Sequence, residues 1–414
     1  MNSVRLPQYM WYEPKEVDFP LPDSWQVTVH NIAGYNRPAM KASEIGAAIT
    51  SPIGSPPLRE VAKDKNEVVI IFDDMTRSTR ASEIVPFVLE ELAEAGITDD
   101  RIRFIAAVGN HQAMDRISMV KKLGEDIVAR FPVYNHCPFL NCTYVGTTSY
   151  GTKASINSEV MHCDLKITIG LVVPHVSYGF SGGGKTIIPG VASYDTVAAH
   201  HGENHEVWKD ERSKQDLPLR GTIDDSPVNA DAREIAKMAG LDMSINCIVN
   251  RWGETVAIFA GSLEPTYQAA VKEAKPHYLA TNTRDNDIVI ANNFIKAGEF
   301  SMALAALPAV THQGGSIVII ANSPSGEVVH YLLGNFGKTI FGSIHRSRTV
   351  APHINNLIIY TEYPECAVLG HFADREKVLL TSDWKQVIQR LEKSHGASAK
   401  VAVYPNAGIQ YFAD

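Results

Sequence analysis

The chain has 414 residues, of which 45% are hydrophobic and 20% charged, a composition typical of a globular protein with two or three domains. The formal net charge of -8 argues against a nucleic-acid partner, and no apolar run approaches the roughly 18 residues of a membrane helix. The N-terminus lacks the apolar core of a signal peptide, and the five cysteines are scattered without CxxC spacing. We therefore expect a cytoplasmic protein with reduced thiols and no membrane partner.

Short apolar runs alternate with helix-like stretches along the chain. The runs predict buried strands at 67–72, 101–109, 164–173, 287–292, 316–321, 356–361 and 400–405. The helix-like stretches lie at 81–96, 265–274 and 382–395. Residues 245–261 are typical of a hairpin that turns at Trp252 and Gly253. This alternation predicts an α/β fold with mostly parallel or mixed sheets.

A polar stretch, "TNTRDND" at 281–287, follows a predicted helix and precedes a new strand series. We place a domain boundary near it. The chain is then expected to form two α/β domains, residues 1–275 and residues 276–414. No internal repeat is visible.

Three motifs concentrate polar residues directly after predicted strands: "DDMTR" at 73–77, "GNHQAM" at 109–114, and a glycine-rich block at 174–190. The carboxyl ends of strands are the usual ligand-binding edge of an α/β sheet. Taken singly, each motif could be a solvated loop, a structural histidine or a flexible glycine turn. Their coincidence favours a functional site.

The glycine-rich block contains a match to the P-loop pattern G-x-x-x-x-G-K-[ST] at 179–186. A P-loop must open a helix that holds the phosphates. Here Ile187, Ile188, Pro189 and Gly190 follow, and they end any helix within about one turn. The pattern therefore disfavours a triphosphatase, which is kept as an alternative together with a metal-dependent hydrolase.

Histidines at 200, 201 and 205 suggest a metal. The zincin pattern needs a glutamate directly after its first histidine, but Gly202 follows His201. A hydrolytic zinc site is thus disfavoured. A single imidazole ligand remains open for a borderline metal such as nickel, which also accepts sulfur ligands.

Together these blocks resemble the nickel-dependent lactate racemase family. The resemblance rests on "DDMTR", "GNHQAM", Asn135-His136 with "GTTSYGT" at 146–152, "PHVSYGFSGGGKTIIPG" and the following "HHG". It covers roughly residues 50 to 262 strongly and the remainder weakly. By this resemblance the chain is expected to be an isomerase, a racemase or epimerase of a 2-hydroxy acid.

The resemblance implies a nickel pincer nucleotide, a pyridinium mononucleotide whose two thioacid arms hold the metal. The family's lysine forms a thioamide with one arm, and Lys185 occupies that position. The family's nickel-binding histidine lies 16 residues later, which selects His201. The resemblance also implies cofactor contacts from Asp74 and from the glycine run Gly182, Gly183 and Gly184. Cofactor-synthesis enzymes would be partners.

The resemblance further implies that His111 and His175 are acid/base groups and that Arg77 helps to hold the substrate carboxylate. One histidine would remove the hydroxyl proton while hydride leaves carbon, giving a planar keto acid that is reduced on either face. Residues 1–275 would form the catalytic and cofactor-binding domain. Residues 276–414 would close the active site between the two domains. The oligomeric state, including a homodimer, stays open.

The second domain departs from the lactate enzymes. They carry a Tyr-Gln pair and a lysine three residues after the Gln, whereas this chain has Ile295, Lys296 and Glu299. Lys296 is the expected substrate-binding cation. Because one cation is moved and one anion added, we predict a 2-hydroxy acid other than lactate, such as a sugar acid. A non-catalytic nucleotide-binding homologue is the remaining alternative.

Overall fold

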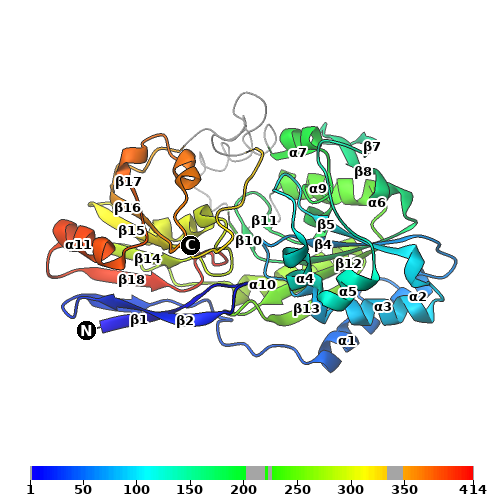
Figure 1. Ribbon diagram of the computed structural model, residues 1–414, viewed down its shortest axis with the longest axis horizontal. Coiled ribbons are helices and arrows are strands. Elements are labelled where there is room, and N and C mark those ends of the chain that lie inside the picture. Colours follow the sequence, from blue (N-terminus) through cyan, green and yellow to red (C-terminus); the bar gives the residue numbers. More distant parts are fainter. Residues whose placement is uncertain (1, 202–219, 222–225, 333–347, 414) are drawn as a thin grey trace. The chain divides into compact units, whose positions relative to one another are not determined.

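The computed structural model describes residues 2–201, 220–221, 226–332 and 348–413 (Figure 1). The chain folds into two compact units. The first unit comprises residues 37–250 and 254–276. The second comprises residues 1–36, 251–253 and 277–414. The predicted α/β fold is confirmed in both units.

The first unit is built on a six-stranded sheet in the order β13-β12-β9-β4-β5-β6. All neighbours pair in parallel except β12 and β13, which form the predicted hairpin. The strands are β4 (Val68–Asp73), β5 (Ile102–Ala107), β6 (Val133–Asn135), β9 (Leu165–Leu171), β12 (Met243–Val249) and β13 (Thr255–Gly261). Every residue of β4, β9 and β12 is buried, as expected for parallel strands covered on both faces.

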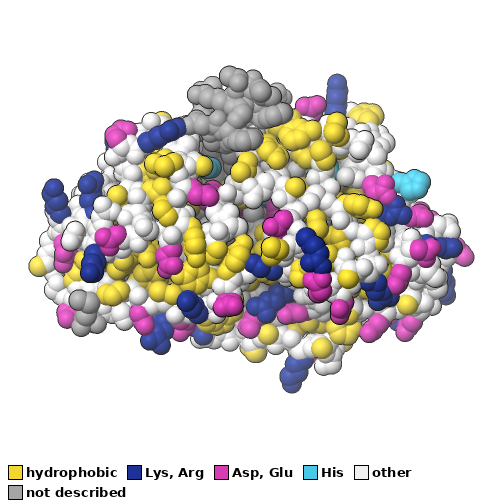
Figure 2. All heavy atoms as spheres, viewed as in Figure 1, with side chains coloured by type: hydrophobic (Ala, Val, Ile, Leu, Met, Phe, Trp, Pro, Cys, Tyr) yellow, Lys and Arg dark blue, Asp and Glu magenta, His cyan; other side chains and the backbone are white. Residues whose placement is uncertain are grey.

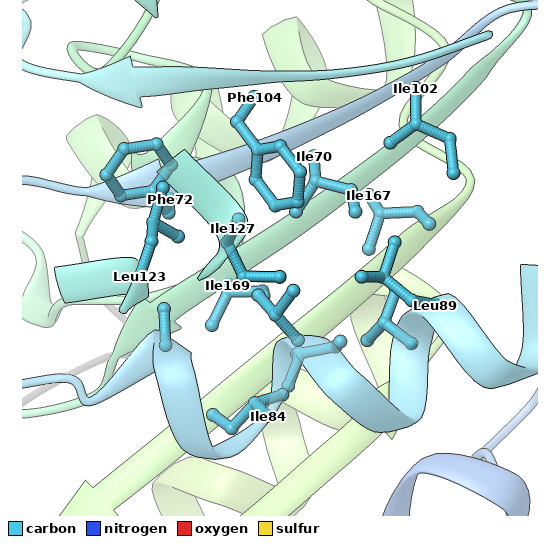
Figure 3. Close-up of a cluster of buried hydrophobic side chains, with 14 of the residues drawn as sticks. Ile70, Phe72, Ile84, Leu89, Ile102, Phe104, Leu123, Ile127, Ile167 and Ile169 are labelled. Carbon is cyan, nitrogen blue, oxygen red and sulfur yellow. The ribbon is translucent and has the colours of Figure 1, made fainter. Parts of the chain in front are cut away.

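Helices cover both faces of this sheet (Figure 1). One face carries α1 (Ala42–Thr50), α2 (Leu58–Val61), α3 (Val85–Glu94), α4 (Arg116–Leu123) and α5 (Glu125–Arg130), with the short turns η1 (Ala81–Glu83) and η2 (Asp99–Arg101) nearby. Other helices of the unit are α6 (Ser158–His162), α7 (Tyr194–His201), α9 (Pro227–Met238) and α10 (Leu263–His277). Figure 3 shows the core under α3, where aliphatic and aromatic side chains interlock: Ile70, Phe72, Ile84, Leu89, Ile102, Phe104, Leu123, Ile127, Ile167 and Ile169.

The strand order reverses between β4 and β9. From β4 the chain moves outward to β5 and β6, then returns to place β9 on the other side of β4. Such a switch point opens a crevice at the carboxyl ends of the two strands, where α/β proteins bind ligands. Two further hairpins lie in this unit, β7 (Cys142–Thr147) with β8 (Lys153–Asn157), and β10 (Pro174–His175) with β11 (Gly179–Phe180).

The second unit holds a six-stranded, wholly parallel sheet in the order β17-β16-β15-β14-β18-β3. Its strands are β3 (Gln26–Val29), β14 (Ile288–Asn292), β15 (Gly315–Ile320), β16 (Ile354–Tyr360), β17 (Val378–Thr381) and β18 (Lys400–Tyr404). One helix, α11 (Trp384–His395), and the hairpin of β1 (Asn2–Gln8) and β2 (Lys15–Leu21) share a core on one face. The unit also contains three described 3₁₀ helices, η4 (Phe300–Ala309), η5 (Cys366–His371) and η6 (Arg375–Lys377).

The predicted division at residue 275 differs from the observed one at the N-terminus. Residues 1–36 belong to the second unit rather than to the first. The reason is long-range pairing, since β3 pairs with β18, and Val4 and Leu6 pack against the core of β14 and β15. The hairpin turn at 251–253 also belongs to the second unit.

No described helix is long and apolar enough to cross a membrane. On the face drawn in Figure 2, basic and acidic side chains are interspersed and form no large patch of one sign.

The side chain of Lys122 in the first unit has no exposed surface. Its ammonium donates to Asp73 Oδ1 at 2.6 Å, to the Arg77 carbonyl at 2.9 Å and to the Thr79 carbonyl at 3.1 Å. Three protons thus meet three acceptors, which is the condition under which a buried ammonium is tolerated.

Lys122→Met should lower the local unfolding free energy of β4 by about 3 to 5 kcal/mol, because the Asp73 carboxylate would stay buried without its cation. Hydrogen exchange of the β4 amides measures this energy. The neighbouring Lys121 is partly exposed, so Lys121→Met is the matched control and should change the value by under about 0.5 kcal/mol. An equal decrease of the unfolding free energy of β4 in Lys122→Met and Lys121→Met would contradict the role of Lys122 as the partner of the buried Asp73 carboxylate.

Candidate functional site

The turn after β4 carries Asp74, Thr76 and Arg77. Asp74 is buried, and its Oδ1 accepts hydrogen bonds from the Thr76 backbone at 3.0 Å and the Thr76 hydroxyl at 2.5 Å. Its Oδ2 lies 2.5 Å from His111 Nδ1. Burial opposes ionisation of Asp74, but His111, Arg77 and Thr76 together outweigh it and hold the pKa of the carboxyl well below its usual range. Asp74 is therefore an anion that accepts from His111.

His111 sits in the tight turn after β5. Because the Asp74 carboxylate can only accept, His111 Nδ1 must carry the proton of this hydrogen bond. In the neutral ring this leaves the lone pair on Nε2, so Nε2 is the basic atom. The turn needs Gly109, whose φ of 53° favours glycine and whose N–H donates to the Gly190 carbonyl at 2.9 Å. The His111 turn is thus tied to the end of the glycine-rich block.

The glycine-rich block folds as β10, β11 and a short 3₁₀ turn, η3 (Gly183–Thr186). No α-helix follows Thr186, which confirms the expectation that this is not a P-loop. The three glycines are all buried. A Cβ would meet Val172 at 2.5 Å from Gly182, the Tyr267 ring at 2.8 Å from Gly183, and the Ala232 carbonyl at 2.7 Å from Gly184. Their observed role is thus close packing of the loop against β9, α10 and α9.

This packing presents Lys185, which remains partly exposed, beside His175. Lys185 Nζ lies 2.7 Å from His175 Nε2 and 4.2 Å from the centroid of the Tyr178 ring. The other ring nitrogen of His175, Nδ1, accepts from the Ser177 backbone N–H at 3.1 Å. In His175, as in His111, the protein engages Nδ1, and the Nε2 atom of His175 faces Lys185.

Behind Lys185 lies a buried chain of hydrogen bonds that the sequence analysis missed. The Tyr178 hydroxyl is 2.7 Å from His200 Nε2, and His200 Nδ1 is 2.7 Å from Asp231 Oδ2. The Thr152 hydroxyl also donates to Asp231 Oδ2, at 2.6 Å. Burial lowers the pKa of His200 despite the carboxylate, so the ring is neutral, donating to Asp231 and accepting from Tyr178.

His200 therefore has both ring nitrogens engaged, whereas its neighbour His201 is partly exposed and stacks near Tyr178 at 5.5 Å between ring centroids. Within the described ranges no group of three or more His, Cys, Asp or Glu side chains could hold a metal ion. His205 lies outside the described residues.

Two further polar residues border the site. Asn110, next to His111, is buried, and neither amide atom has a hydrogen-bond partner among the described residues. His136 is buried between the Ala192 carbonyl, 2.9 Å from Nε2, and the Asn157 amide, 3.1 Å from Nδ1. Burial lowers the pKa of His136 to about 4. The neutral ring hydrogen-bonds Ala192, in the segment that follows the glycine-rich block. Its neighbour Asn135 hydrogen-bonds the backbone of Met114.

The structure thus brings Asp74, His111, His175 and Lys185 onto loops that contact one another in pairs, with Arg77 in the Asp74 turn. Lys296, the remaining predicted residue, follows β14 in the second unit. Its Nζ donates to Glu299 Oε2 at 2.8 Å, and only 2% of its side chain is exposed. The predicted cation is therefore paired with the carboxylate of Glu299.

Comparison with known proteins gives one consistent result. Residues 12–213 match the family model described as the lactate racemase N-terminal domain. A relative named lactate racemase from Thermoanaerobacterium thermosaccharolyticum is 28% identical over 340 residues, 79% of this chain and 76% of the relative. Another relative of that name, from Lactiplantibacillus plantarum, is 28% identical over 310 residues, 72% of this chain and 70% of the relative.

The fold agrees with solved structures. The lactate racemase apoprotein from T. thermosaccharolyticum superposes with a TM-score of 0.74 and 22% identity over 100% of both chains. A protein from Thermotoga maritima superposes with a TM-score of 0.66 and 18% sequence identity, and the match covers 91% of this chain and 99% of that one. At these identities the structural likeness supports the fold alone. The family model and the two named relatives agree in making this chain similar to lactate racemases, which are isomerases acting on a hydroxy acid.

Proposed function

We propose that the chain is a racemase or epimerase of a 2-hydroxy acid other than lactate, working with a nickel pincer nucleotide linked to Lys185. One observation carries the proposal. Two histidines, His111 and His175, have Nδ1 fixed by the protein and Nε2 available as the acid/base atom. Both lie on loops that contact the lysine-bearing loop, through Gly109 to Gly190 and His175 to Lys185.

The residues present fit the cofactor. Lys185 would form the covalent link and His201 would be the nickel ligand from the protein. The choice of His201 over His200 is supported by the full engagement of His200 with Asp231 and Tyr178. A metal held by the cofactor's own sulfur arms needs few protein ligands, in keeping with the lack of a His/Cys/Asp/Glu cluster among the described residues. When bound, the cofactor supplies acceptance and return of a hydride.

The side chains of the first unit would then handle the proton and the carboxylate. Arg77 would hold the substrate carboxylate, with Asp74 fixing His111 in the tautomer whose Nε2 can take the hydroxyl proton. His175 would act from the opposite face through its own Nε2, which carries the proton in a neutral ring that accepts at Nδ1 and would return a proton to the substrate oxygen. Two faces of a planar keto acid need two such groups, and an imidazole with an ordinary pKa of about 6.5 can serve as acid and base near neutrality.

The substrate is proposed to be larger or more polar than lactate because of Lys296. A lysine paired with Glu299 offers both a donor and an acceptor rather than a bare positive charge. Hydroxyl groups match such a pair better than a second carboxylate does. A sugar acid therefore fits the proposal, and the buried, unpartnered amide of Asn110 is a further candidate contact for its hydroxyls.

The division of labour between the histidines can be tested by single-turnover assays with each enantiomer. His111→Gln and His175→Gln should each lose racemisation by about 10² to 10⁴-fold, because a general acid/base group contributes that much. Each variant should still form keto acid from one enantiomer, and the two should differ in which one. His162→Gln, an exposed histidine on α6, is the control. Equal residual rates for both enantiomers in both variants would defeat the two-base proposal.

The role of Glu299 can be tested with a panel of 2-hydroxy acids that includes lactate and aldonic acids. Glu299→Gln removes the anion that neutralises Lys296, so kcat/KM for the preferred polyhydroxy acid should fall about 10-fold or more relative to lactate. A hydrogen bond to a charged group is worth about 1.5 to 3 kcal/mol. The exposed Glu376→Gln, on η6, is the matched control. An unchanged ratio would remove this residue pair from substrate recognition.

A further inference from the structure

The contact between His175 and Lys185 restricts the protonation of both groups. A hydrogen bond at 2.7 Å needs one donor and one acceptor. A lysine ammonium has three donors and no lone pair, whereas a neutral amine can also accept. Which form is present depends on where His175 carries its proton.

The backbone decides the tautomer of His175. The N–H of Ser177 points at Nδ1 from 3.1 Å, and the N–H of Tyr178 approaches the same atom at 3.4 Å. A backbone N–H can only donate, so Nδ1 must be the acceptor and carry no proton. A neutral imidazole then carries its proton on Nε2, which faces Lys185.

We infer that the protein, before any cofactor is attached, holds Lys185 as an unprotonated amine that accepts a hydrogen bond from His175 Nε2–H. Lys185 is then in its nucleophilic form. If Lys185 were an ammonium, two hydrogen-bond donors, Nζ and the protonated Nε2 of His175, would face each other at 2.7 Å, and neither of these two atoms could accept.

The other neighbours of Lys185 are compatible with an amine. The Tyr178 ring, 4.2 Å away, would favour an ammonium, but an amine N–H can also donate to a ring face. From α7, His200 is neutral and bonded to Asp231 and Tyr178. From α9, the Asp231 carboxylate accepts from His200 and Thr152, and Arg233 pairs with Glu264 at 2.8 Å. Asp231 and Arg233 of α9 are thus each engaged with partners of their own.

The chemical use of such an amine is acylation, and this use, unlike the protonation state, rests on the proposed function. A thioacid and an amine condense to a thioamide and water. The nitrogen lone pair bonds to the carbon, the carbon–oxygen bond breaks, and the oxygen leaves with one proton from nitrogen and one from the thioacid. Before the cofactor is attached, His175 would thus position and activate the Lys185 amine. Once the cofactor is attached, His175 would exchange protons with the substrate.

Competitive acetylation of the full-length, cofactor-free protein tests the inference. The protein is first treated at each pH from 7 to 10 with a limiting amount of acetic anhydride of natural isotope composition. It is then denatured, and the remaining amines are acetylated completely with isotopically heavy acetic anhydride. Mass spectrometry then gives the ratio of light to heavy acetyl groups on each lysine peptide. An ordinary exposed amine, with a pKa of about 10.4, gains about 10-fold in labelling per pH unit over pH 7 to 9. Lys153, exposed on β8, is the internal reference.

In the wild-type protein we expect the acetylation of Lys185 to rise less than about 2-fold between pH 8 and pH 10. In His175→Leu its acetylation should instead increase with pH as steeply as that of an ordinary exposed lysine, about 10-fold per pH unit. Ser177→Ala keeps the backbone donor and should behave as wild type. A wild-type Lys185 that follows the Lys153 slope would overturn the inference.

Nitrogen-15 NMR of histidine-labelled wild-type protein gives a second test, in which a variant serves only to assign the signals. The His175 signals, assigned by their loss in His175→Gln, should show a protonated Nε2 and an unprotonated Nδ1. The opposite tautomer, or a doubly protonated ring at pH 8, would overturn the inference. Neither experiment uses cofactor or substrate, so a lack of racemase activity would count against the proposed function alone.

Discussion

The carboxylate of Asp73 joins the strand ends on which the candidate site is built. It ends β4, accepts the Leu171 N–H at the end of β9 at 3.0 Å, and pairs with the fully buried Lys122 of α4. The two strands at the switch point are thereby tied at their carboxyl ends. Asp74 follows one strand directly, and His175 lies four residues after the other. The positions of the proposed acid/base groups therefore depend on the buried ion pair of Asp73 and Lys122.

Packing and backbone hydrogen bonds also fix the site loops. The three glycines before Lys185 let its loop lie directly on β9, α9 and α10, and Gly109 lets the His111 turn bond to Gly190. Each histidine is then oriented through Nδ1, by the Asp74 carboxylate in one case and by a backbone N–H in the other. The two rings thus start from opposite tautomers, His111 with a basic Nε2 and His175 with a protonated one. Such a pair suits a reaction that takes a proton from one face and returns it on the other.

Much of this could be predicted from sequence where the signal is local. Apolar runs located the central strands, and the Ile-Ile-Pro-Gly sequence after Thr186 excluded a P-loop helix. The N-terminal 36 residues were misplaced because the pairing of β3 with β18 spans almost the whole chain and leaves no local pattern. The cofactor contacts expected of Gly182, Gly183 and Gly184 stay a prediction, and a Cβ added at these glycines would meet Val172, Tyr267 and Ala232. The Tyr178–His200–Asp231 chain was missed for the same reason, since its members lie up to 53 positions apart and meet only in the fold.

The central claim is that Lys185 carries the reactive group of a hydroxy acid racemase. The most direct measurement is the intact mass and nickel content of the protein produced together with the cofactor-synthesis enzymes, followed by peptide mapping. The account predicts an added mass on the Lys185 peptide, about one nickel per chain, and loss of both in Lys185→Ala. An unmodified Lys185 in protein that interconverts the enantiomers of a 2-hydroxy acid would contradict it.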